Sequence, residues 1–365
     1  RQPKIQISHV ICNNLTSTHI LYEKEMLLLR LYFFLSLKLV ILDTSVVSLT
    51  TTMNTAKSYI PPAWAVQKLK NAPIHGRLSL ASLPTPVHQV STTGILSELS
   101  KLNITLYIKR DDMSGGVELG GNKIRKLEFL LADALAQNCD SLVTIGGEQS
   151  NHCRATACAA RMVGIEPHLI LRTRKKEEIG MVGNVLLDRL VGSSIYTCTP
   201  GEYGRVGSDD LVNRLCEYLR ISKGKNPYGI PVGGSNALGT WGYIQGVEEL
   251  SLQTEEKKID HVVMSCGSGG TTTGIALGLQ LCPTFEKTKA HAVGVCDDPE
   301  YFYQTMAQIA EDMGLITNGD ENDTGSIIVD MMKRCVKIYQ GKGLGYAVST
   351  PDELEFCIRV ARDTG

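Results

Sequence analysis

The most informative part of the chain is residues 119–127, LGGNKIRKL, in which a lysine follows a glycine pair and an asparagine. The residues after Lys123 have the periodicity of an amphipathic helix, so we expect this lysine at the head of a helix. An amine attacks an aldehyde only when it is neutral, which requires a lowered pKa. We predict that Arg125 and Lys126 help to lower the pKa of Lys123, which is our candidate for a covalent bond to an aldehyde cofactor. Taken alone, the segment is more typical of a turn with a solvated lysine in the first helical turn.

A second loop follows a predicted strand at residues 142–145. Residues 146–152, GGEQSNH, turn from this strand into an alanine-rich helical segment at residues 155–160. Backbone N–H groups at such a helix start bind anions, and the Ser150 hydroxyl and Asn151 amide add hydrogen bonds. We therefore predict a carboxylate site here, although Ser and Asn are also ordinary helix caps.

A third loop, residues 266–274, CGSGGTTTG, follows a predicted strand at residues 261–265 and precedes an apolar helix. Small glycines let the backbone approach an anion closely, and Ser268, Thr271 and Thr272 offer hydroxyls. The spacing matches neither the dinucleotide fingerprint nor the P-loop. A single phosphate group is the predicted ligand.

Together the three loops resemble those of the fold type II pyridoxal phosphate-dependent enzymes, which are tryptophan synthase beta-like. Within them the chain is similar to the D-cysteine desulfhydrase and 1-aminocyclopropane-1-carboxylate deaminase group, from about residue 80 to residue 365. Further matching stretches are LPTP at 83–86, IKRDD at 108–112, PVGGSN at 231–236 and CDDP at 296–299. Residues 150–156 and 182–190 look more like the desulfhydrases than the deaminases.

The resemblance implies pyridoxal 5'-phosphate as cofactor and an amino acid as substrate, with α,β-elimination of D-cysteine to sulfide, ammonia and pyruvate as the reaction. The alternatives are an aminocyclopropane carboxylate deaminase, a racemase or other eliminating enzyme, and a catalytically inert pyridoxal phosphate-binding protein. The implied catalytic residues are Lys123, Ser150 and Tyr346, and the implied substrate contacts are Ser150, Asn151 and His152. The implied cofactor contacts are Asn122, Lys123, Lys126, Asn151, Ser268, Gly269, Gly270 and Thr271. Without the family, Tyr346 within GLGYA would be interpreted as a packed loop tyrosine.

The composition of the chain agrees with an enzyme that acts on small molecules. Net charge is −1, and 43% of residues are hydrophobic. With so little net charge, we expect no electrostatic attraction of nucleic acid or of an anionic membrane surface. The eleven cysteines lack metal-ligand spacing, and adjacent His152 and Cys153 do not easily face one ion, so we expect no metal. Free thiols in a reducing compartment are expected, either the cytoplasm or, as an alternative, the mitochondrion. The resemblance implies a homodimer.

The predicted fold class is α/β, with two doubly wound parallel-sheet domains and the cofactor cleft between them. Strands are expected near 104–109, 142–146, 168–172, 194–197, 228–232, 261–265 and 290–296, with helices after most of them. The resemblance implies a small domain at 126–235 and a large cofactor-binding domain from 58–125 and 236–365.

Both ends of the chain carry expectations of their own. Residues 1–52 are expected to be an extension outside the fold, with translation starting at Met53; an uncleaved signal anchor is the alternative. Residues 351–363 have the pattern of a helix. The resemblance implies that a further strand, a catalytic tyrosine and the partner of the pyridine nitrogen follow Gly365. We therefore expect a C-terminally incomplete chain, and an inactive fragment is an open alternative.

Overall fold

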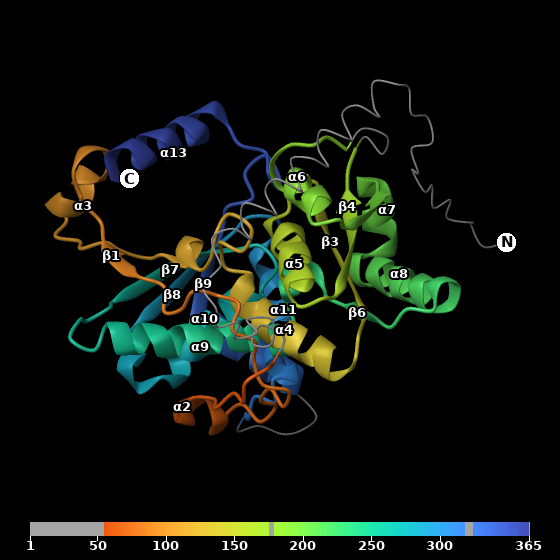
Figure 1. Ribbon diagram of the computed structural model, residues 1–365. Helices are drawn as coiled ribbons and strands as arrows, with labels where there is room; N and C mark the ends of the chain where they lie inside the picture. The colour runs from red at the N-terminus through yellow and green to blue at the C-terminus, as the bar shows by residue number, and fades with distance from the viewer. Residues whose placement is uncertain (1–54, 175–178, 318–323, 365) are drawn as a thin grey trace, which may run out of the picture. The chain divides into compact units, whose positions relative to one another are not determined.

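The computed structural model describes residues 55–174, 179–317 and 324–364 of the chain. The expectations for residues 1–52 and for a start at Met53 lie outside these ranges. Within them, helices alternate with parallel strands, so the predicted α/β class is confirmed (Figure 1). No helix in the described ranges is long and apolar enough to cross a membrane.

The first sheet has four parallel strands in the order β5-β4-β3-β6. Their bounds are β3 Ser141–Gly147, β4 Glu166–Arg172, β5 Ser194–Cys198 and β6 Pro227–Gly229. Helix α8 (Ser208–Lys223) packs Val212 and Leu215 on one face, against alternate residues of β3. Helices α5 (Asn151–Met162) and α6 (Gly183–Leu190) cover the other face. Coverage of both faces explains why the first five residues of β3 are all buried.

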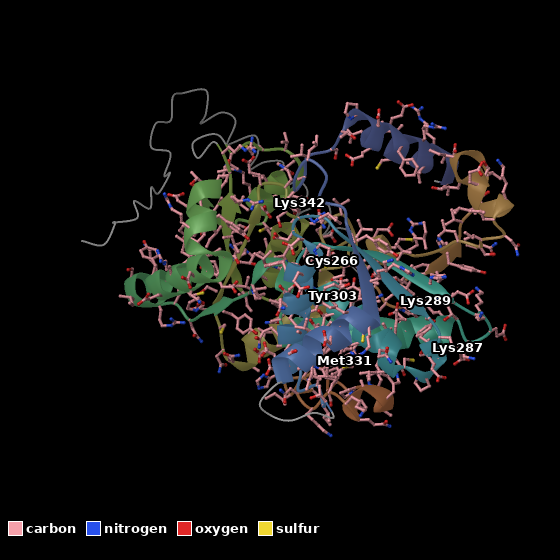
Figure 2. All side chains as sticks on the ribbon, turned by 180° about the vertical axis from the view of Figure 1, so that it is seen from behind. Cys266, Lys287, Lys289, Tyr303, Met331 and Lys342 are labelled. Atoms are coloured by element: carbon pink, nitrogen blue, oxygen red, sulfur yellow. The ribbon has the colours of Figure 1, made fainter. Side chains whose placement is uncertain are left out.

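The second sheet has three parallel strands in the order β7-β8-β9, with bounds His261–Cys266, Lys289–Gly294 and Val336–Gln340. Helices α9 (Ala237–Gln253), α10 (Gly270–Leu281), α11 (Pro299–Asp312) and α12 (Thr324–Cys335) share its apolar cluster, in which Trp241 and Phe302 are fully buried. In Figure 2, Cys266 at the carboxyl end of β7 and Lys289 at the amino end of β8 mark opposite ends of this sheet.

Two features of the strands differ from the sequence expectations. The strand expected near 104–109 is β2 (Tyr107–Lys109), and it pairs antiparallel with β1 (Val87–Gln89). The expectation of parallel pairing is therefore wrong for β2, since antiparallel neighbours need no crossover helix. Strand β9 was not predicted because Val336 directly follows α12, with no glycine or proline to mark the boundary.

Helix α4 (Ile124–Ala136) lies between the two parts of the fold. It is buried on nearly every side and packs on α9 as well as on α5. A helix without a solvent-exposed face is typical of a core position. The buried position of α4 also fixes the place of the segment before it, which ends at Lys123.

Helix α13 (Pro351–Thr364) confirms the helix predicted at residues 351–363. The other short elements are α2 Ala63–Val66, η2 Gly94–Leu96, α3 Ser97–Lys101, η3 Asp111–Met113, α7 Pro200–Val206, η4 Val232–Gly234 and η5 Pro283–Phe285. None of the ten cysteines in the described ranges forms a disulfide.

Candidate active site

The second and third sequence loops both lie at carboxyl ends of parallel strands. The loop around Ser150 follows β3, and the loop around Ser268 follows β7. Helix α5 begins at Asn151 and helix α10 begins at Gly270, so each loop runs directly into a helix N-terminus. Ligands of α/β sheets bind at this edge, where helix N-termini favour negative charge.

Lys123 directly precedes α4 and is partly buried. Its Nζ donates a hydrogen bond to Asn122 Oδ1 at 2.9 Å. Burial lowers the pKa of Lys123 to about 8, so a substantial fraction of the amine is neutral near physiological pH. This is the property that a nucleophilic lysine needs.

The expected contribution of Arg125 to this pKa is wrong. The Arg125 guanidinium is buried and donates to Asp111 Oδ1 and Glu249 Oε1, each at 2.9 Å. These two carboxylates balance its charge, so burial rather than a neighbouring guanidinium lowers the pKa of Lys123. Because Asp111 and Glu249 lie 14 and 124 residues away in the chain, only the folded structure reveals this pairing.

Asn122 connects Lys123 with the glycine-rich loop. Its Nδ2 donates to Thr271 Oγ1 at 3.1 Å, while its Oδ1 accepts from Lys123. The amine of Lys123 and the hydroxyl of Thr271 are therefore two hydrogen bonds apart, although 148 residues separate them in the sequence. The structure thus brings together the first and third sequence loops.

Lys126 is fully buried on the other side of the same loop. Its Nζ donates to Gly233 O at 3.1 Å and to Ser235 Oγ at 3.2 Å. Burial, together with nearby Lys123, holds the pKa of Lys126 well below its usual range. Ser235 Oγ also lies 2.9 Å from Ser268 Oγ and accepts from Gly270 N–H at 3.2 Å.

Close packing at Gly270 shows that the loop is shaped for backbone approach. A Cβ on Gly270 would lie 2.8 Å from Ser235 Oγ and 2.9 Å from Lys126 Nζ, so any side chain would fill the place where these groups meet. Gly269 has a φ of +82°, a conformation that favours glycine. N–H groups, hydroxyls and an amine at a helix start form a donor set that suits a phosphate dianion.

Ser235 is the member of this cluster that sequence reasoning missed. It lies in the PVGGSN stretch, which we used for the family resemblance without giving any residue a role. The pair of glycines before it, both with positive φ, was the available signal of a tight backbone turn near a ligand. What no sequence pattern shows is that this turn lies between Lys126 and Ser268.

The loop after β3 places its three residues differently. Ser150 is the cap of α5, and its Oγ accepts from Cys153 N–H at 3.2 Å. Asn151 is exposed at the start of the helix. His152 is buried, with Nε2 2.9 Å from Thr144 Oγ1, so its side chain lies in the interior and a ligand contact would come from its backbone. Burial and nearby Lys123 hold the pKa of His152 well below its usual range.

Tyr346 follows β9 and lies beside Arg172, at the carboxyl end of β4. The centre of its ring is 5.8 Å from the Arg172 guanidinium carbon, which also lies 4.8 Å from the Tyr203 ring centre. Arg172 pairs in register with Gly147, the residue that begins the turn into the Ser150 loop. The structure therefore places Tyr346 on the side of the Ser150 loop, with half of its surface exposed.

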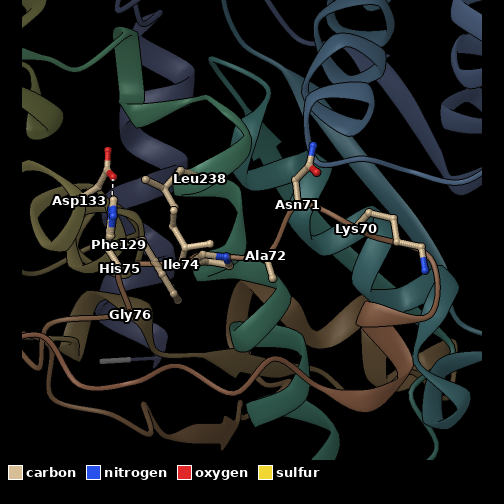
Figure 3. Close-up of a pocket in the computed structure, with 10 residues that line it drawn as sticks. Lys70, Asn71, Ala72, Ile74, His75, Gly76, Phe129, Asp133 and Leu238 are labelled. Atoms are coloured by element: carbon tan, nitrogen blue, oxygen red, sulfur yellow. Dashed lines mark hydrogen bonds and ion pairs between the residues drawn. The ribbon is translucent and has the colours of Figure 1, made fainter. Parts of the chain in front are cut away.

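A cavity of about 320 Å³ lies elsewhere, between the segment around His75 and helix α4. Figure 3 shows the residues that line it. His75 Nδ1 is 2.6 Å from Asp133 Oδ1 at its wall, and Phe129 and Leu238 supply apolar surface. Its lining does not include Lys123 or Ser268. No group of His, Cys, Asp and Glu in the described ranges could hold a metal ion.

The fold and the site define an α/β enzyme with a partly neutral lysine beside a phosphate-type loop. A family model described as "Pyridoxal-phosphate dependent enzyme" matches residues 78–365, and the chain belongs to this family. It is accordingly an enzyme that uses pyridoxal phosphate, as predicted.

Individual proteins that are similar to the chain indicate which group within this family it resembles. The chain is 46% identical, over 85% of its length and 73% of the other protein, to a "Bifunctional D-cysteine desulfhydrase/1-aminocyclopropane-1-carboxylate deaminase, mitochondrial" of Arabidopsis thaliana. It is 36% identical, over 79% of its length and 85% of the other protein, to a "Putative 1-aminocyclopropane-1-carboxylate deaminase" of Thermotoga maritima. A crystal structure described as an "ACC deaminase homologue" matches with a TM-score of 0.66 and 28% identity, covering 83% of this chain and 84% of that one. The predicted resemblance is therefore confirmed.

Proposed function

We propose that this enzyme catalyses the α,β-elimination of D-cysteine to sulfide, ammonia and pyruvate. The observation that carries the proposal is the position of Lys123, a partly buried amine linked through Asn122 to the glycine-rich loop. The relative from Arabidopsis thaliana, whose printed name includes D-cysteine desulfhydrase, supports the choice of substrate.

The cofactor would be held at two ends. Lys123 would bind its aldehyde covalently, with Asn122 beside it. The phosphate would lie at the start of α10, where Ser268, Gly269, Gly270 and Thr271 offer N–H groups and hydroxyls, and Lys126 lies behind Ser235. When bound, pyridoxal phosphate supplies an electron sink for the charge that develops at the substrate Cα.

The chain's own residues supply substrate binding and proton transfer. The substrate carboxylate would lie at the N-terminus of α5, bound by Asn151, the Ser150 loop and the backbone of His152, since the helix dipole favours negative charge there. Once the substrate amine has displaced it from the aldehyde, Lys123 would take the proton from Cα, because its lowered pKa provides a neutral amine near pH 8. The thiolate would then leave Cβ, and water would convert the remaining fragment to pyruvate and ammonia. Tyr346 would orient the substrate from the Ser150 side.

A second candidate reaction is the deamination of 1-aminocyclopropane-1-carboxylate. The printed names of two relatives, from Arabidopsis thaliana and Thermotoga maritima, include this activity. This reaction needs the same carboxylate site and the same base, so the described residues serve either substrate.

The organisation of the chain is also part of the proposal. A small domain at 126–235 is supported by the four-stranded sheet, whose strands all fall within it, and a large domain from 58–125 and 236–365 is supported by the three-stranded sheet. We also propose a homodimer, on the family resemblance. We propose a location in the cytoplasm, with the mitochondrion as alternative because the Arabidopsis thaliana relative is named as mitochondrial.

Product analysis tests the reaction. We expect equal amounts of sulfide and pyruvate from D-cysteine, much less from L-cysteine, and little ketobutyrate from aminocyclopropane carboxylate. Lys123→Ala should lower the rate by about a thousandfold or more, because it removes both the covalent attachment and the base. Lys101→Ala is the matched control, since Lys101 is exposed on α3 and pairs with Glu98. Ketobutyrate as the main product would replace the proposal by the second candidate.

A further inference from the structure

Asn184, the second residue of α6, is bonded to the loop that carries Ser150 and Asn151. Its Nδ2 donates to Gln149 O at 2.8 Å and to Asn151 Oδ1 at 3.0 Å. Its backbone N–H donates to Gln149 Oε1 at 2.8 Å, and Gln149 Nε2 in turn donates to Val182 O at 3.2 Å. The loop is thus held by four hydrogen bonds from a segment more than 30 residues away in the chain.

Two neighbouring groups determine the orientation of the Asn184 amide, because one can only accept a hydrogen bond and the other can only donate one. A backbone carbonyl can only accept, so the end of the Asn184 side chain beside Gln149 O must be the NH₂ group. The opposite end, Oδ1, lies 3.5 Å from Nη1 of Arg154, and a guanidinium can only donate. The same arginine donates through Nη2 to Gly120 O at 2.7 Å, in the turn that leads to Lys123.

The orientation of the Asn184 amide determines the orientation of the Asn151 amide. Since the NH₂ group of Asn184 faces it, Asn151 must present its oxygen to Asn184. The other end of the Asn151 amide is then Nδ2, which is a donor. A donor at the N-terminus of α5 suits a carboxylate, whereas a flipped amide would present an acceptor and repel one.

We propose that Asn184 is a positioning residue for substrate binding: it fixes the Asn151 amide so that Nδ2, rather than Oδ1, donates to the substrate carboxylate. The inference rests on the proposed function, because it assumes that the carboxylate lies at the start of α5. It assigns to α6 a role in substrate affinity that is separate from the covalent chemistry of Lys123.

A double-mutant cycle with two readouts tests this inference. The readouts are the KM for D-cysteine and the Kd for D-alanine, which has the same carboxylate and amine but lacks the leaving group, measured calorimetrically with the holoenzyme. Asn184→Ala should raise both about tenfold with little change in kcat, because a misoriented amide loses a hydrogen bond to a charged group. Asn184→Asp should raise them further, since its carboxylate would attract the Asn151 NH₂ group away from the substrate.

The cycle separates orientation from general stability. In an Asn151→Ala background, Asn184→Ala should change KM and Kd by less than about twofold, because no amide is left to orient. Asn226→Ala is the matched control, since Asn226 Nδ2 also donates two hydrogen bonds, here to the backbone carbonyls of Gln137 and Asn138 at 3.1 Å each. It should lower the unfolding midpoint and leave both constants unchanged.

Each result has a definite meaning. Unchanged constants in Asn184→Ala, or equal effects in the presence and absence of the Asn151 amide, would overturn the inference while D-cysteine turnover persists. Wild-type enzyme that binds D-alanine but releases no sulfide or pyruvate would instead overturn the proposed reaction, and the binding cycle would still test Asn184. Wild-type enzyme that does not bind D-alanine would count against the carboxylate site and therefore against both.

Discussion

At the scale of single residues, two lysines three positions apart have different surroundings. Lys123 is partly buried and bonded to Asn122, whereas Lys126 is fully buried against Gly233 and Ser235. Residues three apart lie on one face of a helix, so the two amines are near each other. The amine of Lys126 donates to Gly233 and Ser235 and supports the phosphate-type loop, which leaves Lys123 to present its amine to a bound aldehyde.

The pKa of Lys123 predicts how cofactor attachment depends on pH. A lysine pKa lowered from its usual value of 10.5 to about 8 means that the neutral amine is populated as pH rises through about 8. Adding pyridoxal phosphate to cofactor-free protein should therefore give an attachment rate that rises roughly tenfold between about pH 7 and pH 9 and then levels off. The rate is measured from the change in cofactor absorbance.

One variant serves as a control for this prediction, and one result would contradict it. Lys123→Arg should show no covalent attachment at any pH, because a guanidinium stays protonated. Attachment that accelerates only above about pH 10 would mean that burial does not lower the pKa of Lys123.

At the scale of elements, the contact between α4 and α9 sets the position of the site. Gly242 of α9 lies against the first turn of α4, where a Cβ would be 2.5 Å from the carbonyl carbon of Arg125. The two helix backbones therefore touch, and Lys123 is two residues from this contact. Gly246, one turn further along α9, has its nearest such contact at 3.4 Å, with the Tyr243 ring.

Alanine substitutions at these two glycines should have opposite effects. Gly242→Ala should lower the free energy of unfolding by about 2–3 kcal/mol, because backbone cannot move aside as a side chain can. Gly246→Ala should be neutral or stabilising by up to about 1 kcal/mol, since alanine favours the helix more than glycine does. Urea unfolding of the cofactor-free proteins measures both. Equal effects of the two substitutions would contradict close contact at Gly242.

At the scale of the whole described unit, the proposed cofactor contacts come from different parts of the chain. Lys123 and Lys126 lie at the start of α4, Ser235 follows the last strand of the four-stranded sheet, and Ser268 follows β7 of the three-stranded sheet. A ligand that binds all of these at once stabilises the folded state, because the unfolded chain offers no such site.

Removing the cofactor should therefore lower stability. At a free concentration of one hundred times Kd, pyridoxal phosphate should add about 2.7 kcal/mol to the free energy of unfolding. Thermal unfolding with and without added cofactor measures the shift, with Lys123→Ala as a control that should bind less tightly and shift less. An identical midpoint in both conditions would contradict binding at the site.

How much of the fold and of the candidate site could be predicted from the sequence depends on how far apart in the sequence the residues lie that produce each feature. The strands near 142–146, 168–172, 194–197 and 261–265 were predicted to within a few residues, because alternation of apolar runs and turn residues is a local property. The three loops followed from their own composition, since glycine, serine and threonine before a helix produce a helix start with free donors wherever they occur.

The contacts between those loops depended on tertiary packing. The ion pairs of Arg125 and the places of Ser235 and Asn184 arise where residues distant in the sequence meet. The inward direction of His152 arises from the packing of α5 on β3. The amino acid order thus specified which chemical groups exist and on which elements they lie, whereas folding selected which of them face one another. The physical reason is that side-chain direction and burial are properties of the packed elements rather than of any short segment.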